Sequence, residues 1–210
     1  MLRKIYLSPL GIVISIAMNI LAAFRRPFMV YGYRDKVSGK FRKLTRVSST
    51  AAINDVGNIA IGNNVWIGHY NILDGNDGII IGDGCQLAAR VSIFTHSSQD
   101  AIRLLGASFI ATHNSARAGY MRGRVELGEY TFVGTGSTIM PGVILGRGCL
   151  VGANSLVLTS APDYAILRGS PAQIVGDVRD LDKKFLKDPE IRKTYFDQEF
   201  ATSFGDKADS

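Results

Sequence analysis

The chemistry available to this chain centres on three histidines, because imidazole is the side chain that exchanges protons near neutral pH. His96 follows the strand-like run 92–95 and stands where a regular sequence pattern gives way to a loop over 97–124. Such a place gives a rigid root and an open face, so we expect His96 to act as a general base; a structural histidine is the alternative. His113 is expected on a surface or at an interface, and His69 at the edge of a pocket or in solvent.

The two cysteines, Cys85 and Cys149, form neither a disulfide framework nor a CxxC pair for zinc. Each falls at a small, inward position of the repeat described next, so both are expected as buried core thiols. This cysteine usage favours a reduced, cytoplasmic setting.

A six-residue period organises the middle of the chain. Aliphatic residues recur at every sixth position in one block and, with one longer step, in an earlier block: Leu127, Val133, Ile139, Leu145, Val151 and Val157, after Ile61, Ile67, Leu73, Ile81, Leu87 and Ile93. Gly and Asn recur at fixed offsets and supply the positive backbone angles of tight corners. Three six-residue sides close one triangular coil of about 18 residues, so we expect an all-β solenoid over about 53–176.

The period fails between Ile93 and Leu127, where a loop leaves the solenoid. This loop contains one acidic residue, Asp100, and four arginines: Arg103, Arg117, Arg122 and Arg124. An arginine-rich arm on a body short of bases suits phosphate or an anionic glycan, with Arg103 as a candidate acceptor contact. A solvated, flexible insertion is the alternative.

The net charge of +6 belongs to the N-terminal part of the chain. Residues 1–46 contain ten Lys or Arg and one acidic residue, whereas residues 47–176 contain seven Arg, no Lys and eight acidic residues. A nearly neutral body excludes a nucleic-acid footprint across the fold. The basic segment suits anionic lipid head groups, so residues 1–46 are a candidate contact with a membrane surface.

The run 5–24 contains no charged residue and would extend about 30 Å as a helix. Arg25 and Arg26 follow where a signal peptide needs a small-residue cleavage site, which argues against a cleaved leader. Three interpretations remain: a helix that spans the membrane, one that lies on its surface at the inner face of the cytoplasmic membrane, and one that packs on the body or a neighbouring subunit.

The predicted organisation has three parts. Residues 1–46 form a hydrophobic, basic N-terminal helix and hairpin, and residues 47–177 form the solenoid domain with its loop. Residues 178–210 form a C-terminal helical segment. Apolar residues there recur at helical spacing, and Pro189 divides them into two amphipathic helices that cap the solenoid or clasp a neighbour.

The repeat resembles that of the hexapeptide-repeat acyltransferase superfamily. The stretches 70–74, 81–84 and 92–96 look like the acceptor-and-histidine segment of galactoside and maltose O-acetyltransferases. The long loop and hydrophobic N-terminus look more like members that acetylate lipopolysaccharide or capsular sugars. The resemblance implies a left-handed parallel β-helix and a homotrimer.

The resemblance also implies roles for individual residues. His96 matches the catalytic histidine, and Asp74 matches a nearby acid. Either Asp74 or a backbone carbonyl would fix the tautomer of the imidazole. His69 and Asn71 fall in the stretch that lines the acceptor pocket.

Contacts with acetyl-coenzyme A are implied in the same way. Thr135 and Ala153 lie one coil apart, at positions whose backbone groups contact the coenzyme in that family, and Phe132 stands where a Trp is usual. The implied reaction transfers an acetyl group from acetyl-coenzyme A to a sugar hydroxyl of a surface polysaccharide or its lipid-linked precursor. The hydroxyl oxygen attacks the thioester directly, without an acyl-enzyme or a metal.

The closing signature of the family is altered in this chain. Gln173 replaces a base that helps to hold the coenzyme, so nearby Arg168 or Arg179 is expected to substitute. Two other functions fit a solenoid of this kind. One is a non-catalytic scaffold, and the other is a γ-type metalloenzyme, which needs three histidines to converge on one ion.

Overall fold

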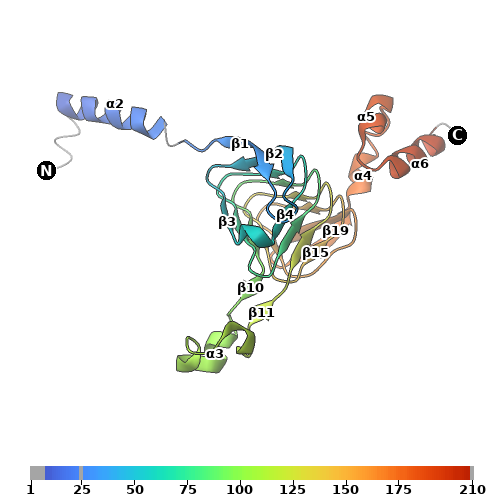
Figure 1. Ribbon diagram of the computed structural model, residues 1–210. Coiled ribbons are helices and arrows are strands. Elements are labelled where there is room, and N and C mark those ends of the chain that lie inside the picture. The colour runs from blue at the N-terminus through green and yellow to red at the C-terminus, as the bar shows by residue number, and fades with distance from the viewer. Residues whose placement is uncertain (1–7, 24–25, 209–210) are drawn as a thin grey trace.

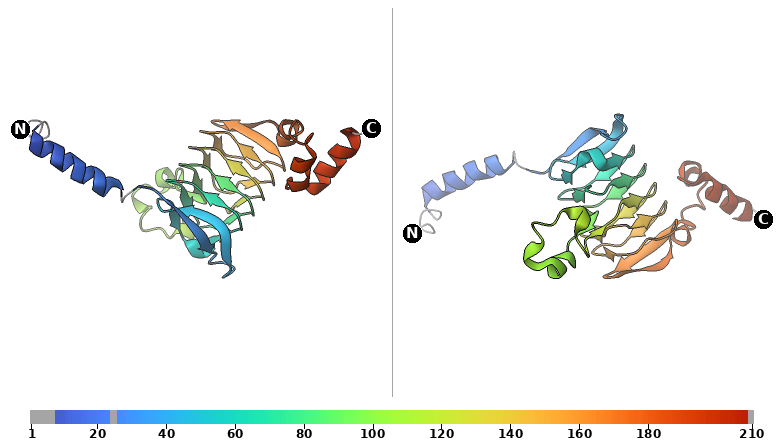
Figure 2. Two further views of the ribbon diagram at one scale, coloured as in Figure 1. Left: turned by 90° about the horizontal axis from the view of Figure 1, so that it is seen from above. Right: turned by 60° about the horizontal axis from the view of Figure 1, so that its bottom comes forward.

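The computed structural model describes residues 8–23 and 26–208 of the chain. A column of short strands forms the body, and helix α2 (Pro9–Ala23) projects from its N-terminal end (Figure 1). Three helices follow the other end of the column: α4 (Val178–Asp182), α5 (Pro189–Thr194) and α6 (Gln198–Ala208). Figure 2 shows that the loop leaves the column between these two ends.

Three sheets form the faces of the column. Face A contains the parallel strands β2 (Phe41–Ser48), β5 (Trp66–Ile67), β8 (Gln86–Leu87), β13 (Phe132–Val133), β16 (Leu150–Val151) and β18 (Ala165–Gly169), with antiparallel β1 (Met29–Arg34) and β19 (Ala172–Asp177) at its edges. Face B contains β3 (Ala52–Asn54), β6 (Ile72–Asp74), β9 (Ser92–Phe94), β14 (Thr138–Ile139) and β17 (Leu156–Val157). Face C contains β4 (Ile59–Ile61), preceded by the turn η1 (Val56–Asn58), then β7 (Ile79–Ile81), β12 (Val125–Leu127) and β15 (Ile144–Leu145).

Successive coils pair in register, as a β-helix requires. Phe132 pairs with Leu150, which makes that coil 18 residues long, whereas Trp66 pairs with Gln86, 20 residues away. The earlier coil is longer because the step from Leu73 to Ile81 takes eight residues instead of six. The mostly parallel sheets are consistent with a left-handed β-helix.

The predicted inward residues form the core. All twelve aliphatic positions of the repeat are at most 2% exposed, so the six-residue period correctly predicted which side chains are buried. Close stacking of the coils requires glycine at some corners. A Cβ on Gly134 would lie 2.6 Å from the backbone nitrogen of Ala153, so the coils could not approach so closely with another residue there.

The two cysteines are buried core thiols, as predicted. Burial raises the pKa of Cys85 to about 12 and that of Cys149 to about 11, so both remain protonated at neutral pH. Each thiol donates to a backbone carbonyl at the same corner of the next coil. The acceptors are Gly128 O for Cys85 and Pro162 O for Cys149, both at 3.1 Å. Neither is a nucleophile.

Helix α2 carries exposed apolar side chains along its length. The most exposed are Leu10, Ile12, Val13, Ile16, Met18, Ile20 and Leu21, each at 55–62%. The predicted run 5–24 also includes residues 5–7 and 24, which lie outside the described residues. Across 8–23 and 26–208, no helix has the length and apolarity needed to cross a bilayer. After this helix, β2 joins face A by pairing with β5, so the predicted boundary at residue 46 falls inside a strand.

The C-terminal segment has three helices where the sequence pattern predicted two. Pro189 begins α5 rather than only dividing two helices, because proline suits the first position of a helix. The segment is attached to the solenoid through Tyr164, whose hydroxyl donates to Asp197. Burial and the Asp197 carboxylate raise the pKa of Tyr164 to about 12. Leu186 and Ala201 are buried, and the Phe196 ring lies 4.8 Å from Tyr130 and 6.0 Å from Tyr164, so the segment contacts the solenoid at these two rings.

The loop is a small lobe on a two-stranded stem. Its stem pairs β10 (His96–Ser97) with β11 (Met121–Arg122), and the lobe contains α3 (Ala101–Leu105) and the turns η2 (Gly106–Ser108) and η3 (Asn114–Ala116). The lobe projects from the column on its stem in Figure 1. The predicted interruption is therefore a folded excursion with elements of its own.

Candidate active site

The parallel pairing of β6 and β9 brings His96 and Asp74 together. Asp74 pairs with Phe94, and His96 follows two residues later at the start of the stem. The imidazole Nδ1 lies 3.3 Å from Asp74 Oδ2, and the two side chains are 28% and 17% exposed. Nδ1 is buried. Nε2 is therefore the ring nitrogen left to exchange a proton with a ligand.

Thr95 holds the backbone around this dyad of His96 and Asp74. Its buried hydroxyl donates to Asp74 O (2.7 Å) and accepts from the backbone N–H of Asp77 (3.0 Å). The backbone N–H of Gly123 donates to Thr95 O (3.0 Å), so the chain returns from the loop beside the residue at which it left. His96 therefore stands on a rigid root, as predicted from its place in the sequence.

An ion pair closes the base of the loop. Arg122 is the cross-strand partner of His96, and its guanidinium lies 2.6–2.8 Å from the Asp77 carboxylate. The hydrogen bond and charge of Asp77 raise the pKa of Arg122 above its ordinary value. The cation is thus engaged with the coil and helps to fix the stem.

The other loop arginines are also engaged. Arg103 donates to Gln99 O (2.6 Å) and Asp100 (2.5 Å), and Arg124 pairs with Glu126. Arg117 donates to two backbone carbonyls within the loop. The Arg103 and Arg124 side chains remain 70% and 58% exposed, and surface ion pairs of this kind are weak. The expectation that this arm, with Arg103, meets an anionic acceptor therefore stays a prediction.

A second group of predicted residues gathers at a different corner. The corner between faces A and B contains His69, Thr135 and Ala153, each of which follows a strand of face A. The dyad lies at the next corner, between faces B and C. Backbone bonds join these turns, since Arg90 N–H donates to His69 O and Asn154 N–H donates to Thr135 O, both at 2.8 Å. Thr135 and Ala153 are exposed. The site residues predicted from the sequence therefore occupy two corners of one column.

The closing hairpin extends this second corner. Arg168 on β18 is the cross-strand partner of Gln173 on β19, and both are exposed. Arg179, the other candidate to replace the missing base, donates to Asp177 at 2.6–3.2 Å and stacks over Tyr164 at 4.5 Å. Arg168 is therefore better placed than Arg179 to meet an anionic ligand at this corner.

Two further predicted residues lie away from both corners or inside the column. Phe132 is exposed on face A, at a hollow of about 320 Å³ that also contacts the C-terminal helices. Asn71 is fully buried, and its side-chain amide accepts from Val91 N–H (2.8 Å) and donates to Leu87 O (3.5 Å). The acceptor contact expected for Asn71 is not supported, because the coil uses both polar atoms. It is a structural residue.

The other two histidines lie in separate environments. His69 Nδ1 is 2.7 Å from Ser48 Oγ, and His113 caps η3 on the exposed loop, where its Nδ1 is 2.8 Å from Ser115 Oγ. Among residues 8–23 and 26–208, no three His, Cys, Asp or Glu side chains converge on one point. The metalloenzyme interpretation gains no support from this arrangement.

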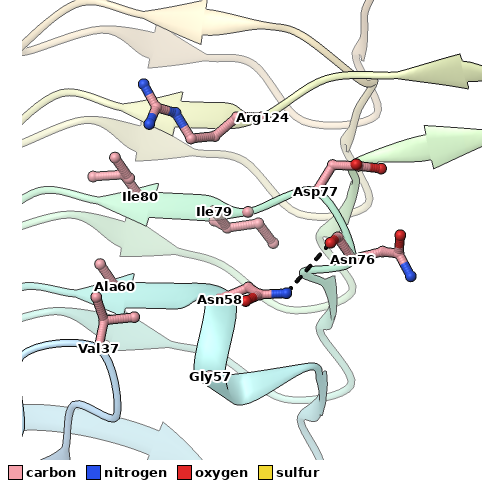
Figure 3. A pocket seen from close by; sticks show the side chains of 10 residues that line it. Val37, Gly57, Asn58, Ala60, Asn76, Asp77, Ile79, Ile80 and Arg124 are labelled. Atoms are coloured by element: carbon pink, nitrogen blue, oxygen red, sulfur yellow. Dashed lines mark hydrogen bonds between the residues drawn. The ribbon is translucent and has the colours of Figure 1, made fainter. Parts of the chain in front are cut away.

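A groove on face C, whose lining includes neither His96 nor Asp74, was not predicted from the sequence. It has a volume of about 450 Å³ and crosses β4 and β7 on face C. Figure 3 shows Val37, Ala60 and Ile80 along one side, with Arg124 above them and Asp77 at the corner that carries the loop. The longer step from Leu73 to Ile81 is the sequence signal that could have pointed to this widened corner.

Comparison with known proteins agrees with this architecture. Residues 124–159 match the family model "Bacterial transferase hexapeptide (six repeats)", and residues 58–94 match "Hexapeptide repeat of succinyl-transferase". The chain therefore contains two blocks of hexapeptide repeats, and its coils and inward aliphatic residues fit the hexapeptide-repeat acyltransferase superfamily.

Individual relatives are acyltransferases of several kinds. "Putative lipopolysaccharide biosynthesis O-acetyl transferase WbbJ" of Escherichia coli K12 is 29% identical over 126 residues, which are 57% of this chain and 60% of WbbJ. The solved N-acyltransferase AntD of Bacillus cereus, in complex with dTDP and coenzyme A, is 26% identical with a TM-score of 0.53, covering 68% of this chain and 88% of AntD. A galactoside acetyltransferase in complex with coenzyme A shares the fold, at 20% identity and a TM-score of 0.52, over 63% of this chain and 62% of that one. The chain spans about half the length of the curated relatives it matches.

Proposed function

We propose that this protein transfers an acetyl group from acetyl-coenzyme A to a hydroxyl of a sugar, in a surface polysaccharide or its lipid-linked precursor. The observation that carries the proposal is the dyad of His96 and Asp74, set at the open root of a loop on a hexapeptide solenoid. Similarity to WbbJ supports oxygen as the acceptor atom, and the coenzyme A complex of AntD supports the donor.

The dyad supplies the proton transfer that this reaction needs. Nε2 of His96 takes the proton of the sugar hydroxyl as its oxygen attacks the thioester carbonyl. The Asp74 carboxylate, 3.3 Å from Nδ1, stabilises the imidazolium that forms. When the tetrahedral intermediate collapses, the carbon–sulfur bond breaks and the imidazolium returns its proton to the leaving thiolate. The products are the acetyl ester and coenzyme A.

The two separated corners support a site shared between copies of the chain, and the family resemblance supplies the homotrimer that belongs to the proposal. The residues expected to hold the coenzyme, Thr135, Ala153 and Arg168, lie at the corner between faces A and B, whereas His96 lies at the corner between faces B and C. A single column therefore cannot present both groups to one acetyl-coenzyme A at a shared corner. A neighbouring copy completes the site when its corner between faces A and B lies against the corner between faces B and C of this copy.

Membrane-surface contact through residues 1–46 also belongs to the proposal, at the cytoplasmic face where acetyl-coenzyme A is available. The exposed apolar side chains of α2 support it, as do the exposed Lys36, Lys40 and Lys43 of the hairpin that follows. We expect the protein to sediment with vesicles containing anionic phospholipid. Lys36→Glu/Lys40→Glu/Lys43→Glu reduces that binding, whereas the control Lys183→Glu/Lys184→Glu at the other end leaves it unchanged. Equal binding by all three proteins, or none, refutes the contact.

The proposed reaction is tested by following labelled acetyl from acetyl-coenzyme A into the surface-glycan precursors of the host. Wild-type protein is compared with His96→Ala and with His113→Ala, a control that removes an exposed loop histidine. Base-labile label in carbohydrate, lost only with His96→Ala, supports the proposal. Label that resists mild base indicates an amide and an amino-sugar acceptor. No label from wild-type protein, together with no coenzyme binding, supports the scaffold interpretation.

A further inference from the structure

An aromatic residue of the loop stacks, with an offset, on the imidazole of the dyad. The ring of Tyr120 lies 5.7 Å from that of His96, centroid to centroid, with 21° between the two planes. Tyr120 immediately precedes β11, and His96 begins β10, so the stem of the loop sets the two rings in an offset stack. Asp74 meets one edge of the imidazole, and Tyr120 is stacked, with an offset, beside it.

Tyr120 is itself held by a cation that the loop encloses. The guanidinium of Arg117 lies 4.0 Å from the centroid of the Phe109 ring and 5.7 Å from that of Tyr120. Its Nε donates to Phe109 O (3.1 Å) and Thr112 O (3.0 Å), which fixes its position within the lobe. Contacts of this type favour a defined placement of the aromatic ring.

Close packing inside the lobe removes freedom from the backbone next to Tyr120. Gly119 has φ +73°, and a Cβ there would lie 2.8 Å from Leu104 Cδ1 and 3.3 Å from Ala101 N. Ala101, the first residue of α3, is fully buried although it lies outside the solenoid core. The segment that presents Tyr120 is thus packed against α3 rather than free in solvent.

We propose that Tyr120 is a positioning residue for His96, and that Arg117 and the lobe exist in part to hold it there. This inference rests on the proposed function, because it assigns a role toward the base of that reaction. An imidazole restrained only by a carboxylate at one edge can rock about its side-chain bonds. A ring stacked on its face keeps Nδ1 toward Asp74 and Nε2 toward the ligand.

The test follows the imidazole directly, apart from the reaction. The chain has three histidines, so ¹³Cε1-histidine labelling gives three assignable signals. Tyr120→Leu removes the ring current over His96, and Tyr120→Phe keeps it. We expect Tyr120→Leu to move the His96 signal alone, with His69 and His113 unchanged as internal controls. An unmoved His96 signal overturns the inference whether or not the protein is active.

A kinetic comparison then tests the role. We expect Tyr120→Leu to lower kcat by about 10-fold or more with an unchanged Kd for coenzyme A, and Tyr120→Phe to retain wild-type kcat. Arg117→Met should show a smaller loss in the same direction. A shifted His96 signal with unchanged kcat overturns the positioning role. Tyr31→Leu, at an exposed tyrosine of β1, is the matched control and should alter neither readout. An inactive wild-type protein overturns the proposed function, and the NMR comparison still decides whether Tyr120 holds the ring.

Discussion

Replacing Asp74 by Asn tests whether the dyad works as a unit. The substitution keeps the size of the side chain and removes the charge 3.3 Å from His96 Nδ1. Coulomb's law gives about 1.3 kcal/mol for two unit charges at this separation in bulk water, and about 5 kcal/mol at an effective dielectric constant of about 20. Both side chains are partly exposed, so about 2–3 kcal/mol of stabilisation for the imidazolium is expected. This corresponds to a loss of about 30–150-fold in kcat.

The assay is the initial rate of coenzyme A thiol release in the presence of the acceptor found by label transfer. His96→Ala should lose about 10²–10⁴-fold, more than Asp74→Asn, because it removes the base itself. The double variant should be no slower than His96→Ala alone, since Asp74 acts through the imidazole. Asp100→Asn, which removes a carboxylate paired with Arg103 in the loop, is the matched control and should keep wild-type kcat.

Three results refute this reasoning. Full activity in Asp74→Asn shows that the carboxylate does not support the base. A double variant whose losses multiply shows that Asp74 and His96 act independently. A rise in KM for acetyl-coenzyme A at unchanged kcat places Asp74 in binding and not in the proton transfer.

Three further predictions concern the framework of the site. Ile139→Ala empties a fully buried position and should lower the free energy of unfolding by about 2–5 kcal/mol in urea titrations, whereas a loss below 1 kcal/mol contradicts the continuous core. Thr95→Val leaves Asp74 O and Asp77 N–H without their side-chain partner and should cost about 1–3 kcal/mol by the same measurement; an unchanged midpoint contradicts that role. Burial alone would raise the pKa of Asp197, but hydrogen bonds from Tyr164 and a backbone N–H lower it on balance. The contribution of Asp197 to stability is therefore complete above about pH 4, its ordinary pKa, and is lost as the pH falls through the lower pKa of the folded state. The protection factors of the α6 amides, which are corrected for the intrinsic pH dependence of exchange, should therefore fall in acid and, in Asp197→Asn, already at neutral pH; protection factors that do not depend on pH contradict the sign.

The repeat made the fold predictable because each coil repeats the same physical requirement. An inward aliphatic residue every six positions, a small residue between them and a glycine or asparagine at the corner specify one triangular turn, and stacking extends it. The same logic placed Cys85 and Cys149 in the core. The position of His96 was predictable for a related reason, since the failure of the period marks where the chain leaves the column.

Contacts that depend on side-chain geometry were not predictable in this way. The loop arginines were expected to meet an anionic ligand, and the sequence pattern did not show that Asp77, Asp100, Glu126 and loop carbonyls also contact them. Asn71 was expected in an acceptor pocket because of the resemblance of its neighbours, but it occupies an inward position. There the burial of an amide requires that the coil itself satisfy it. The stacking of Tyr120 on His96 depends on how 24 residues of loop fold back, which no periodic pattern encodes.

The position of the loop explains how this solenoid carries an extra lobe without losing its own stability. The excursion begins after Thr95 and ends before Gly123, and the N–H of Gly123 donates to Thr95 O at 3.0 Å. Gly142 N–H in turn donates to Gly123 O at 3.1 Å, so the corner continues to the next coil as if nothing had been inserted. Since no inward position of the repeat lies within the loop, its residues are free of the packing demands of the core. Under the proposed function, that freedom allows Tyr120 and Arg117 to serve His96, at the corner between faces B and C rather than on a strand.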